Sequence, residues 1–517
     1  MELPARFVER VLRDLGEAEG RALCAALDAP SPVSIRLNPA KCGADGGSCR
    51  IPEEDAAAEC AGLVSGKCAG PIPGAGAAEG ADSRVPGTGV ADGSAAMCDD
   101  AVAGLLRRLG ATERVPWSDA GWYLAARPLF TLDSDFHAGA YYVQEASSQV
   151  VGRLLGGDAL RGARVLDLCA APGGKTTLYA SLVGSEGLVV ANEIDRRRAQ
   201  VLADNVRKWG TGNVAVTCCE PRTVCDFEAW FDVVAVDAPC SGEGMFRKDD
   251  GARAEWSEGN VRMCAARQDD ILREAWRALR PGGTLLYSTC TFNRDEDEGS
   301  LERLAAWAGD ELAEVPVVAM DEAWGVVCGR VGVFRTFRFY PHRARGEGFF
   351  AAVARKAPDA GGRTRTPKAR RSIISAVDRT SAAELARWLR EPERMRFGEV
   401  AGMCYAWYAA QAEAVRQLSD ALPVICSGVA LGQIFKGRLK PDGALALFAG
   451  LDRGAVPVAE LGEEEALRYL RRQEIAAQGL AEGVNLVCAR GRALGFAKRI
   501  GARVNNMYPN SLRIVMK

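Results

Sequence analysis

Residues 164–177 read Arg-Val-Leu-Asp-Leu-Cys-Ala-Ala-Pro-Gly-Gly-Lys-Thr-Thr, an apolar run followed by a glycine pair. The run at 164–169 is typical of a short buried strand, and the glycines precede a helical stretch at 175–183. Candidate strands and helices alternate on the rest of this part of the chain. The strands are predicted at 188–193, 213–218, 231–237 and 283–289, and the helices at 195–209, 262–279 and 294–308. This alternation predicts an α/β fold with a doubly wound, Rossmann-like parallel sheet.

The composition indicates a soluble globular protein. The chain has 517 residues, of which 48% are hydrophobic and 26% charged, and about three domains are expected for this length. No apolar run approaches the ~20 residues of a membrane span, and the N-terminus lacks the pattern of a secretion signal. We therefore expect a cytoplasmic protein. The net charge of −2 does not exclude nucleic-acid binding, because that depends on where the charges lie.

Seventeen cysteines stand beside only two histidines. The number of cysteines is odd and they lack paired CxxC spacing, which argues against a disulfide framework and against a zinc site. We expect no metal, and we expect most of the cysteines to be small buried apolar side chains.

Changes in composition divide the chain into seven segments. They are an N-terminal extension at 1–40, a low-complexity insertion at 41–98 that is expected to be poorly ordered, the rest of the extension at 99–160, the α/β domain at 161–356, a linker at 357–372, a helical connecting region at 373–420 and a β-rich C-terminal domain at 421–517. The linker is polar and basic, which is typical of a tether between domains. Contact with nucleic-acid phosphate is the alternative for it.

The turn after the first strand has the composition of a ligand-binding loop. Gly173 and Gly174 allow a close approach of the backbone, and the next helix offers unpaired N–H groups. The loop has neither the GxGxxG spacing of dinucleotide sites nor the GxxxxGK[ST] spacing of P-loops. Glu193 follows the second strand, where such folds hold a ribose, and a surface carboxylate is the alternative reading.

Two cysteines follow neighbouring strands of the predicted sheet. Cys240 lies in Val-Asp-Ala-Pro-Cys-Ser-Gly-Glu-Gly-Met-Phe-Arg-Lys-Asp (236–249), and Cys290 lies in Leu-Tyr-Ser-Thr-Cys-Thr (286–291). Backbone amides and the cations Arg247 and Lys248 are surroundings that lower a thiol pKa and favour the reactive thiolate. A single cysteine after a strand is most often structural. Two of them beside a ligand loop predict a catalytic pair.

These segments resemble those of the Sun-type (nucleolar-protein/Sun) RNA cytosine-C5 methyltransferases, in particular the bacterial ribosomal small subunit methyltransferase F group. The similarity lies in DLCAAPGGKTT (167–177), NEID (192–195), VDAPCSGEGMFRKD (236–249) and YSTCTFNRDEDE (287–298), with flanking similarity at 115–123, 137–148, 338–350 and 505–513. It covers nearly the whole chain except 41–98. The resemblance implies an S-adenosylmethionine-dependent methyltransferase core, an N-terminal α+β extension that binds RNA, and a PUA-like RNA-binding domain at 421–517.

The resemblance also implies roles for single residues. Cys290 would be the nucleophile, Cys240 would promote product release, and Asp237 would face the cofactor and the target base. Lys248, a further catalytic candidate, and Arg247 would lie near the target nucleotide. Cofactor contacts are implied for Cys169, Ala170, Ala171, Pro172, Gly173, Gly174, Lys175, Glu193, Glu220 and Asp237. The family usually has Asp where this chain has Glu220, so the adenine-side contact departs from the pattern.

The implied reaction is methylation of carbon 5 of cytosine in RNA, with 16S ribosomal RNA as the expected substrate. A thiolate that adds to carbon 6 makes carbon 5 nucleophilic, and the base must leave its stack before the thiolate can reach it. Transfer RNA is an alternative substrate, and a non-catalytic RNA-binding assembly factor is a second alternative. A DNA methyltransferase would use Cys240 as nucleophile and would not need Cys290. We expect a monomer that binds neither DNA nor a membrane.

Overall fold

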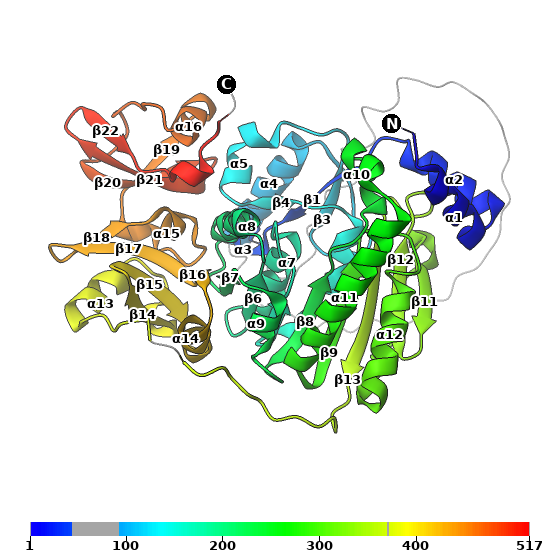
Figure 1. Ribbon diagram of the computed structural model, residues 1–517. Helices are drawn as coiled ribbons and strands as arrows, with labels where there is room; N and C mark the ends of the chain where they lie inside the picture. Colours follow the sequence, from blue (N-terminus) through cyan, green and yellow to red (C-terminus); the bar gives the residue numbers. More distant parts are fainter. Residues whose placement is uncertain (1, 44–92, 370–371, 516–517) are drawn as a thin grey trace, which may run out of the picture.

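The computed structural model describes residues 2–43, 93–369 and 372–515. Most of the predicted low-complexity insertion, residues 44–92, lies outside these ranges. A ten-stranded sheet occupies the centre of the molecule, and three four-stranded sheets flank it (Figure 1). None of the helices in the described ranges is long and apolar enough to cross a bilayer.

The five predicted parallel strands form the middle of the central sheet, in the order β9-β8-β5-β6-β7. They are β5 (Arg164–Asp167), β6 (Leu188–Asn192), β7 (Val214–Thr217), β8 (Phe231–Asp237) and β9 (Leu279–Thr289). The predicted doubly wound α/β fold is therefore confirmed. The direction of winding reverses between β5 and β8, and folds of this kind bind ligands where the order reverses.

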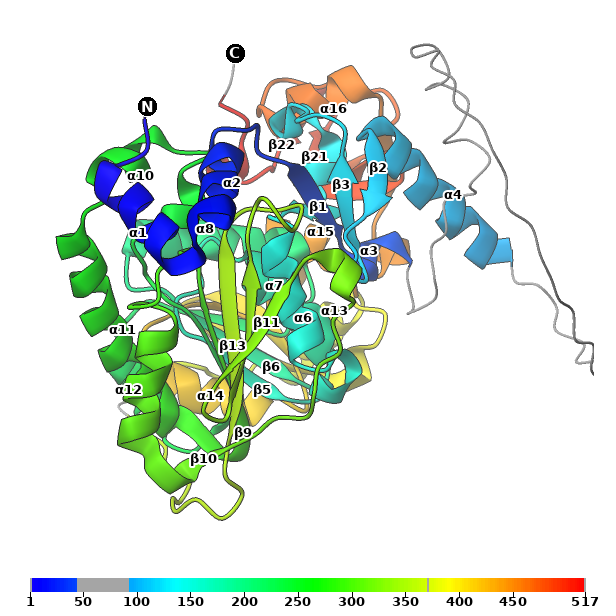
Figure 2. The ribbon, with the colours of Figure 1, turned by 90° about the vertical axis from the view of Figure 1, so that its right-hand side faces the viewer.

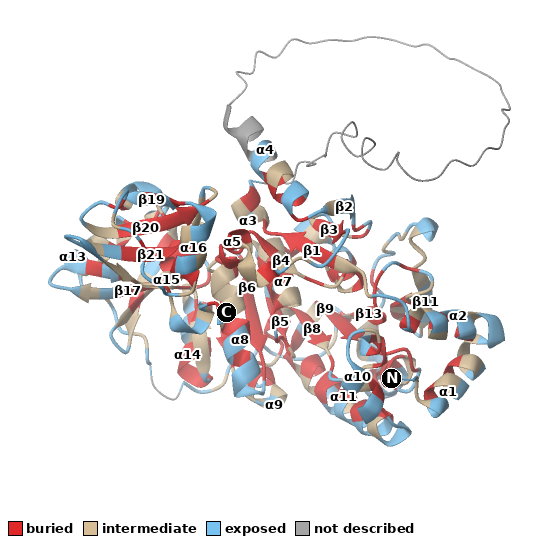
Figure 3. Ribbon diagram, turned by 90° about the horizontal axis from the view of Figure 1, so that it is seen from above, coloured by how far each residue is buried: buried red, intermediate tan, exposed pale blue. Residues whose placement is uncertain are grey.

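Helices cover both faces of this sheet and bury it. They are α7 (Gly174–Val183), α8 (Arg196–Trp209), α9 (Pro221–Cys225), α11 (Glu258–Ala278) and α12 (Glu298–Ala308), whereas the short α10 (Asp250–Glu255) packs with helices of the N-terminal extension. Side chains of α7 and α8 belong to one apolar core, and those of α9, α11 and α12 belong to a second core. Figure 3 shows the result, with buried strands inside and exposed outer faces on the helices.

Antiparallel strands that were not predicted extend the sheet at both edges. On the β9 side lie β13 (Phe349–Lys356), β12 (Phe334–Phe339) and β11 (Val327–Val331), with the short β10 (Leu312–Ala313) beside β13. On the other side β16 (Val424–Ser427) pairs with β7. The predicted domain boundary at residue 421 needs correction here, because β16 completes the central sheet and not a C-terminal one.

The N-terminal extension forms an antiparallel sheet in the order β2-β3-β1-β4. Its strands are β1 (Val33–Leu37), β2 (Ala111–Arg114), β3 (Gly121–Leu124) and β4 (Tyr141–Val143), and its helices are α1 (Ala5–Leu15), α2 (Glu17–Leu27), α3 (Pro39–Cys42), α4 (Gly93–Arg108), α5 (Ser134–His137) and α6 (Val151–Leu154). Both ends of the predicted poorly ordered insertion, 41–42 and 93–98, are helical instead. Figure 2 shows α1 and α2 above the central sheet, near α10.

The C-terminal part contains two sheets. The first comprises β14 (Met395–Val400), β15 (Met403–Tyr408), β17 (Val429–Phe435) and β18 (Arg438–Pro441), and the second β19 (Val458–Leu461), β20 (Gly483–Ala489), β21 (Arg492–Ile500) and β22 (Arg503–Asn506). The helices are α13 (Arg379–Ala386), α14 (Ala412–Ala421), α15 (Gly443–Leu447) and α16 (Glu463–Leu470). The region 373–420 was predicted to be helical, and that prediction was wrong for β14 and β15, whose hairpin pairs with β17.

Candidate active site

The glycine-containing loop connects β5 to α7, as predicted. Gly173 has a φ of +109°, and a Cβ atom there would lie only 3.0 Å from Leu202 Cδ1. Two side chains of α8 hold the loop: Arg198 Nη2 donates to the Ala171 carbonyl at 3.0 Å, and Asn205 Nδ2 donates to the Pro172 carbonyl at 2.9 Å. Helix and loop therefore fix the backbone of this turn, and glycine is the residue that fits it.

Two buried carboxyl groups lie beside this loop. Burial raises the pKa of Asp167 to about 7, and Thr176 Oγ1 donates to its carboxyl group at 2.6 Å. The side chain of Glu193 is only 3% exposed, with Arg198 Nη1 3.3 Å from Oε2 and the Asp195 N–H donating to Oε1. The alternative reading of Glu193 as a surface carboxylate is therefore wrong. Glu220, by contrast, is exposed at the N-terminus of α9.

Lys175 and Asp237 form an ion pair at the end of β8, with Nζ 2.8 Å from Oδ2. Ser288 Oγ donates to the other carboxylate oxygen at 2.9 Å, and the Lys175 ammonium lies 5.1 Å from the centre of the Phe349 ring. Burial alone would lower the pKa of Lys175, but Asp237 and other nearby groups, including Cys290, raise it above its ordinary value. Lys175 is thus a fixed positive charge in the site.

The two predicted cysteines meet in space. The Sγ atoms of Cys240 and Cys290 lie 3.2 Å apart, at the ends of the adjacent parallel strands β8 and β9. Both side chains are partly exposed. The hydrogen bond with Cys290, together with burial, raises the pKa of Cys240 well above its ordinary value. The proton therefore stays on Cys240, whose S–H can donate to Cys290.

This result corrects the prediction of a lowered thiol pKa for Cys240. The cations expected beside the cysteines are paired with Glu347: Arg247 Nη1 lies 3.6 Å and Lys248 Nζ 3.5 Å from its carboxylate. Arg247 also donates to the Pro30 carbonyl in the N-terminal extension. The Arg247 side chain therefore links the loop after β8 to the N-terminal extension.

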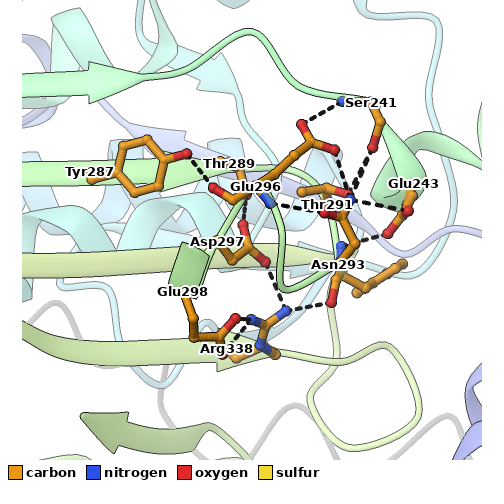
Figure 4. A network of polar contacts seen from close by, with 11 residues as sticks. Ser241, Glu243, Tyr287, Thr289, Thr291, Asn293, Glu296, Asp297, Glu298 and Arg338 are labelled. Atoms are coloured by element: carbon orange, nitrogen blue, oxygen red, sulfur yellow. Dashed lines mark hydrogen bonds and ion pairs between the residues drawn. The ribbon is translucent and has the colours of Figure 1, made fainter. Parts of the chain in front are cut away.

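A buried polar network holds the two cysteine loops together (Figure 4). Glu296 accepts from the Ser241 N–H at 2.9 Å and from Asn293 Nδ2 at 2.7 Å, and Gln268 Nε2 also donates to it. Glu243 accepts from the Phe292 N–H at 2.9 Å. These bonds join the loop after β8 to the loop after β9, so the sulfur positions are set by buried hydrogen bonds.

The same network extends to β12 and requires a glycine. Arg338 donates to Asp297 at 2.8 Å and to both carboxylate oxygens of Glu298 (Figure 4). The Gly244 N–H donates to the Cys290 carbonyl at 2.8 Å, and a Cβ atom on Gly244 would lie 2.6 Å from the Gly348 carbonyl oxygen. Only glycine lets the two loops approach so closely.

Two protein families match the chain, one over the α/β domain and one over the C-terminal part. A family described as 16S rRNA methyltransferase RsmB/F matches residues 158–355, and one described as Methyltransferase RsmF PUA domain matches residues 456–514. Ribosomal RNA small subunit methyltransferase F of Erwinia tasmaniensis is 31% identical over 424 residues, which are 77% of this chain and 84% of the relative. The chain belongs to the ribosomal RNA small subunit methyltransferase F family.

A second member of the family, from Klebsiella pneumoniae, is 32% identical over 77% of this chain and 84% of its own length. Among solved structures, the crystal structure of PH0851 is similar with a TM-score of 0.51 and 25% identity, and covers 68% of this chain and 66% of that one. These findings confirm the predicted family, the fold class with its PUA-like domain, an RNA methyltransferase activity and S-adenosylmethionine as cofactor.

The site of this methyltransferase fits S-adenosylmethionine. Gly173 packs closely on Leu202 of α8, and its positive φ turns the chain into the N-terminus of α7, whose unpaired N–H groups suit a charged ligand. Glu193 offers a buried carboxylate oxygen, the kind of acceptor that ribose hydroxyl groups need. Asp237 offers a partly exposed carboxylate opposite Lys175. Loop, acceptor and charge come from adjacent strand ends, as the cofactor requires.

Several residues of the site were not predicted. Glu243, Asn293, Glu296, Asp297 and Arg338 are buried and connect the cysteine loops. The acidic run after Cys290 was visible in the sequence, but it was assigned to a helix from residue 294. Helix α12 begins only at Glu298, because the residues before it form the network. An acidic run directly after the predicted catalytic cysteine, Cys290, was the available signal.

Proposed function

We propose that the protein methylates carbon 5 of a cytosine in 16S ribosomal RNA, with Cys290 as nucleophile and Cys240 as the group that assists product release. The observation that carries this proposal is the pair of thiols 3.2 Å apart on adjacent strand ends. The names of the matching family and of both relatives support the substrate, since each refers to ribosomal RNA of the small subunit.

Carbon 5 of cytosine is a weak nucleophile as long as the ring is aromatic. The Cys290 thiolate forms a bond to carbon 6, and carbon 5 then becomes the nucleophilic carbon of an enamine. Bound S-adenosylmethionine supplies a methyl group on a positively charged sulfur. Asp237, held by Lys175 and Ser288, would donate to N3 of the base and balance the negative charge that develops there if its carboxyl group is protonated.

Release of the product requires that carbon 5 lose its proton and that the bond from sulfur to carbon 6 break. The proton of carbon 5 passes to solvent, the electron pair of the C5–H bond re-forms the ring double bond, and the pair of the S–C6 bond returns to Cys290. The Cys240 S–H, kept protonated by its raised pKa, can donate to that departing thiolate across 3.2 Å. Cys240 is therefore the natural group to promote the elimination.

The cofactor contacts stay as predicted in this proposal. The loop from Cys169 to Lys175 would hold the methionine and ribose parts, and Glu193 would accept from the ribose hydroxyl groups. Burial raises the pKa of Cys169, so that this thiol stays neutral and lines the site. Glu220, exposed after β7, would approach the adenine side. Lys248, with a third of its side chain exposed, would approach the target nucleotide.

The pairing of both thiols supports RNA over DNA as the substrate. An enzyme that acted on DNA with Cys240 alone would have no need for a second sulfur at 3.2 Å. We also propose that the protein acts as a monomer, because both thiols, the loop and the ion pair belong to one sheet of one chain.

The test compares Cys290→Ala with Cys240→Ala on small-subunit ribosomal RNA. Cys290→Ala should lower methylation by at least about a thousandfold and form no covalent adduct. Cys240→Ala should instead accumulate a protein–RNA adduct on a denaturing gel, because addition proceeds and elimination fails. Bisulfite mapping of ribosomal and transfer RNA gives the substrate. Full activity of Cys290→Ala would refute the mechanism, and methylation of transfer RNA alone would refute the substrate.

A further inference from the structure

The hairpin formed by β17 and β18 exposes an aromatic ring among cations. Phe435, the last residue of β17, is 67% exposed. The two residues of the turn, Lys436 and Gly437, both have positive φ values, of 51° and 75°. Such turns are usually built from Asn, Asp or Gly, so a lysine at the first position is unusual. The Lys436 ammonium lies 5.5 Å from the centre of the Phe435 ring.

The register of the hairpin gathers the exposed side chains on one face. Phe435 pairs with Arg438 and Gln433 pairs with Lys440, so these four side chains share a face of the two-stranded ribbon. All four residues are exposed. The opposite face carries the Ile434–Leu439 pair, which packs on the core of this part of the chain. The ribbon is thus anchored on one side and free on the other.

All charged side chains of the hairpin are cations. Residues 429–441 contain Lys436, Arg438 and Lys440 and no Asp or Glu. Glu384 of α13 reaches the hairpin, but its Oε1 accepts from the Leu439 N–H at 3.1 Å, and its other oxygen pairs with Arg387. This carboxylate is therefore committed to holding the strand and leaves the three cations of the outer face and tip available.

We propose that the β17–β18 hairpin binds an unpaired stretch of the substrate RNA. A base stacks on the ring of Phe435, the three cations contact the phosphates on either side, and Gln433 hydrogen-bonds a base edge. An aromatic platform among cations is how proteins hold unpaired nucleotides. The hairpin lies outside both segments that match a family, 158–355 and 456–514, and in a different sheet from the thiols. The proposal rests on RNA as the substrate and adds a second contact to it.

RNA fits this surface better than a protein does. The outer face presents one apolar side chain, Phe435, beside an amide and cations, and a protein interface needs a larger apolar centre. Figure 1 shows the hairpin at the outer edge of the C-terminal part, apart from the central sheet that contains β8 and β9.

The first test measures the affinity of the full-length protein for small-subunit ribosomal RNA. Phe435→Ala should weaken binding about 5- to 100-fold, and Phe435→Trp should retain it, because stacking needs an aromatic plane. Phe435→Leu, which keeps apolar area without the plane, should behave like the alanine variant. Arg273→Gln, on the exposed surface of α11, is the control and should bind like the unchanged protein. Equal affinity of the alanine variant and the unchanged protein would overturn the proposal.

The second test uses salt. The slope of log affinity against log salt concentration should fall by about 0.7 for each phosphate contact removed, in Lys436→Gln and in Arg438→Gln. Methylation by these variants should show a raised KM and an unchanged kcat, because the thiols are untouched. Variants that lose activity on assembled subunits while binding free RNA normally would point to a protein partner and overturn the proposal. Loss of RNA affinity in a protein that methylates no ribosomal RNA would instead refute the proposed function alone.

Discussion

Two regions differ in how far their polar side chains are buried. One is the pair of loops that carry Cys240 and Cys290, and the other is the β17–β18 hairpin. In the loops, buried carboxylates and amides such as Glu296 and Asn293 bond to one another, and the two cysteines beside them stay partly exposed. In the hairpin, one face is anchored and every side chain of the other face is open to solvent. We infer that changes in the network will alter folding and catalysis together, whereas changes in the hairpin will alter binding alone.

Arg338→Ala tests the network at its most buried cation. The side chain is 7% exposed and donates to Asp297, Glu298 and the Phe292 carbonyl. Its removal leaves buried acceptors without a donor, so the free energy of unfolding should fall by about 3–5 kcal/mol, and methylation should fall with it. Thermal and denaturant unfolding measure the first effect.

Arg330→Ala is the matched control, because that side chain is 51% exposed on the neighbouring strand β11. It should change the free energy of unfolding by less than about 0.5 kcal/mol. Equal effects of the two variants would contradict the inference that the network carries stability.

The buried carboxyl group of Asp167 should make the free energy of unfolding depend on pH. Burial raises its pKa from 3.8 to about 7, so between these values the folded protein keeps a proton that the unfolded chain has released. The free energy of unfolding therefore falls as pH rises through this window. Asp167→Asn removes the contribution and should gain about 3–4 kcal/mol relative to the unchanged protein between pH 4 and pH 7. Denaturant unfolding at a series of pH values measures it.

The exposed Asp158, whose side chain is 93% exposed, supplies the comparison. Asp158→Asn should change the free energy of unfolding by less than about 0.5 kcal/mol. A flat difference between Asp167→Asn and the unchanged protein across the window would show that Asp167 is ionised in the folded state.

Phe435→Ala should have the least effect on folding. With 67% of the residue exposed, little apolar surface is lost, and the free energy of unfolding should change by less than about 0.5 kcal/mol. The same variant is expected to weaken RNA binding, so stability and affinity separate in one molecule. A large fall in the melting temperature of this variant would show that the Phe435 ring contributes to the core. It would contradict the inference that changes in the hairpin alter binding alone.

The alternation of strands and helices was sufficient to predict the centre of the fold. The strand expected at 231–237 is β8 residue for residue, because a buried parallel strand is a continuous apolar run. The edge strands were missed for the opposite reason. Val424–Ser427 is four residues long and partly exposed, and only its pairing with β7 across more than two hundred residues makes it a strand of this sheet.

The positions of those site residues that directly follow a parallel strand could be predicted from the sequence. Cys240, Cys290 and Glu193 follow strands, and parallel strands bring their carboxyl ends to one edge. The thiol environment was not predictable, since Arg247 and Lys248 are near in sequence but pair with Glu347, a hundred residues away. Buried acids such as Glu296 look like surface residues until their partners are known.

The central sheet is complete only after strand β16, which lies in the C-terminal part of the chain, has been synthesised. The chain leaves the central sheet after β13, builds β14, β15 and α14, and returns to cover the open side of β7 before it enters the last domains. Until residues 424–427 have emerged from the ribosome, β7 is a bare edge with unpaired backbone groups, the kind that recruits other strands. A chain that ends before residue 424 would leave this edge of the central sheet open, which favours aggregation.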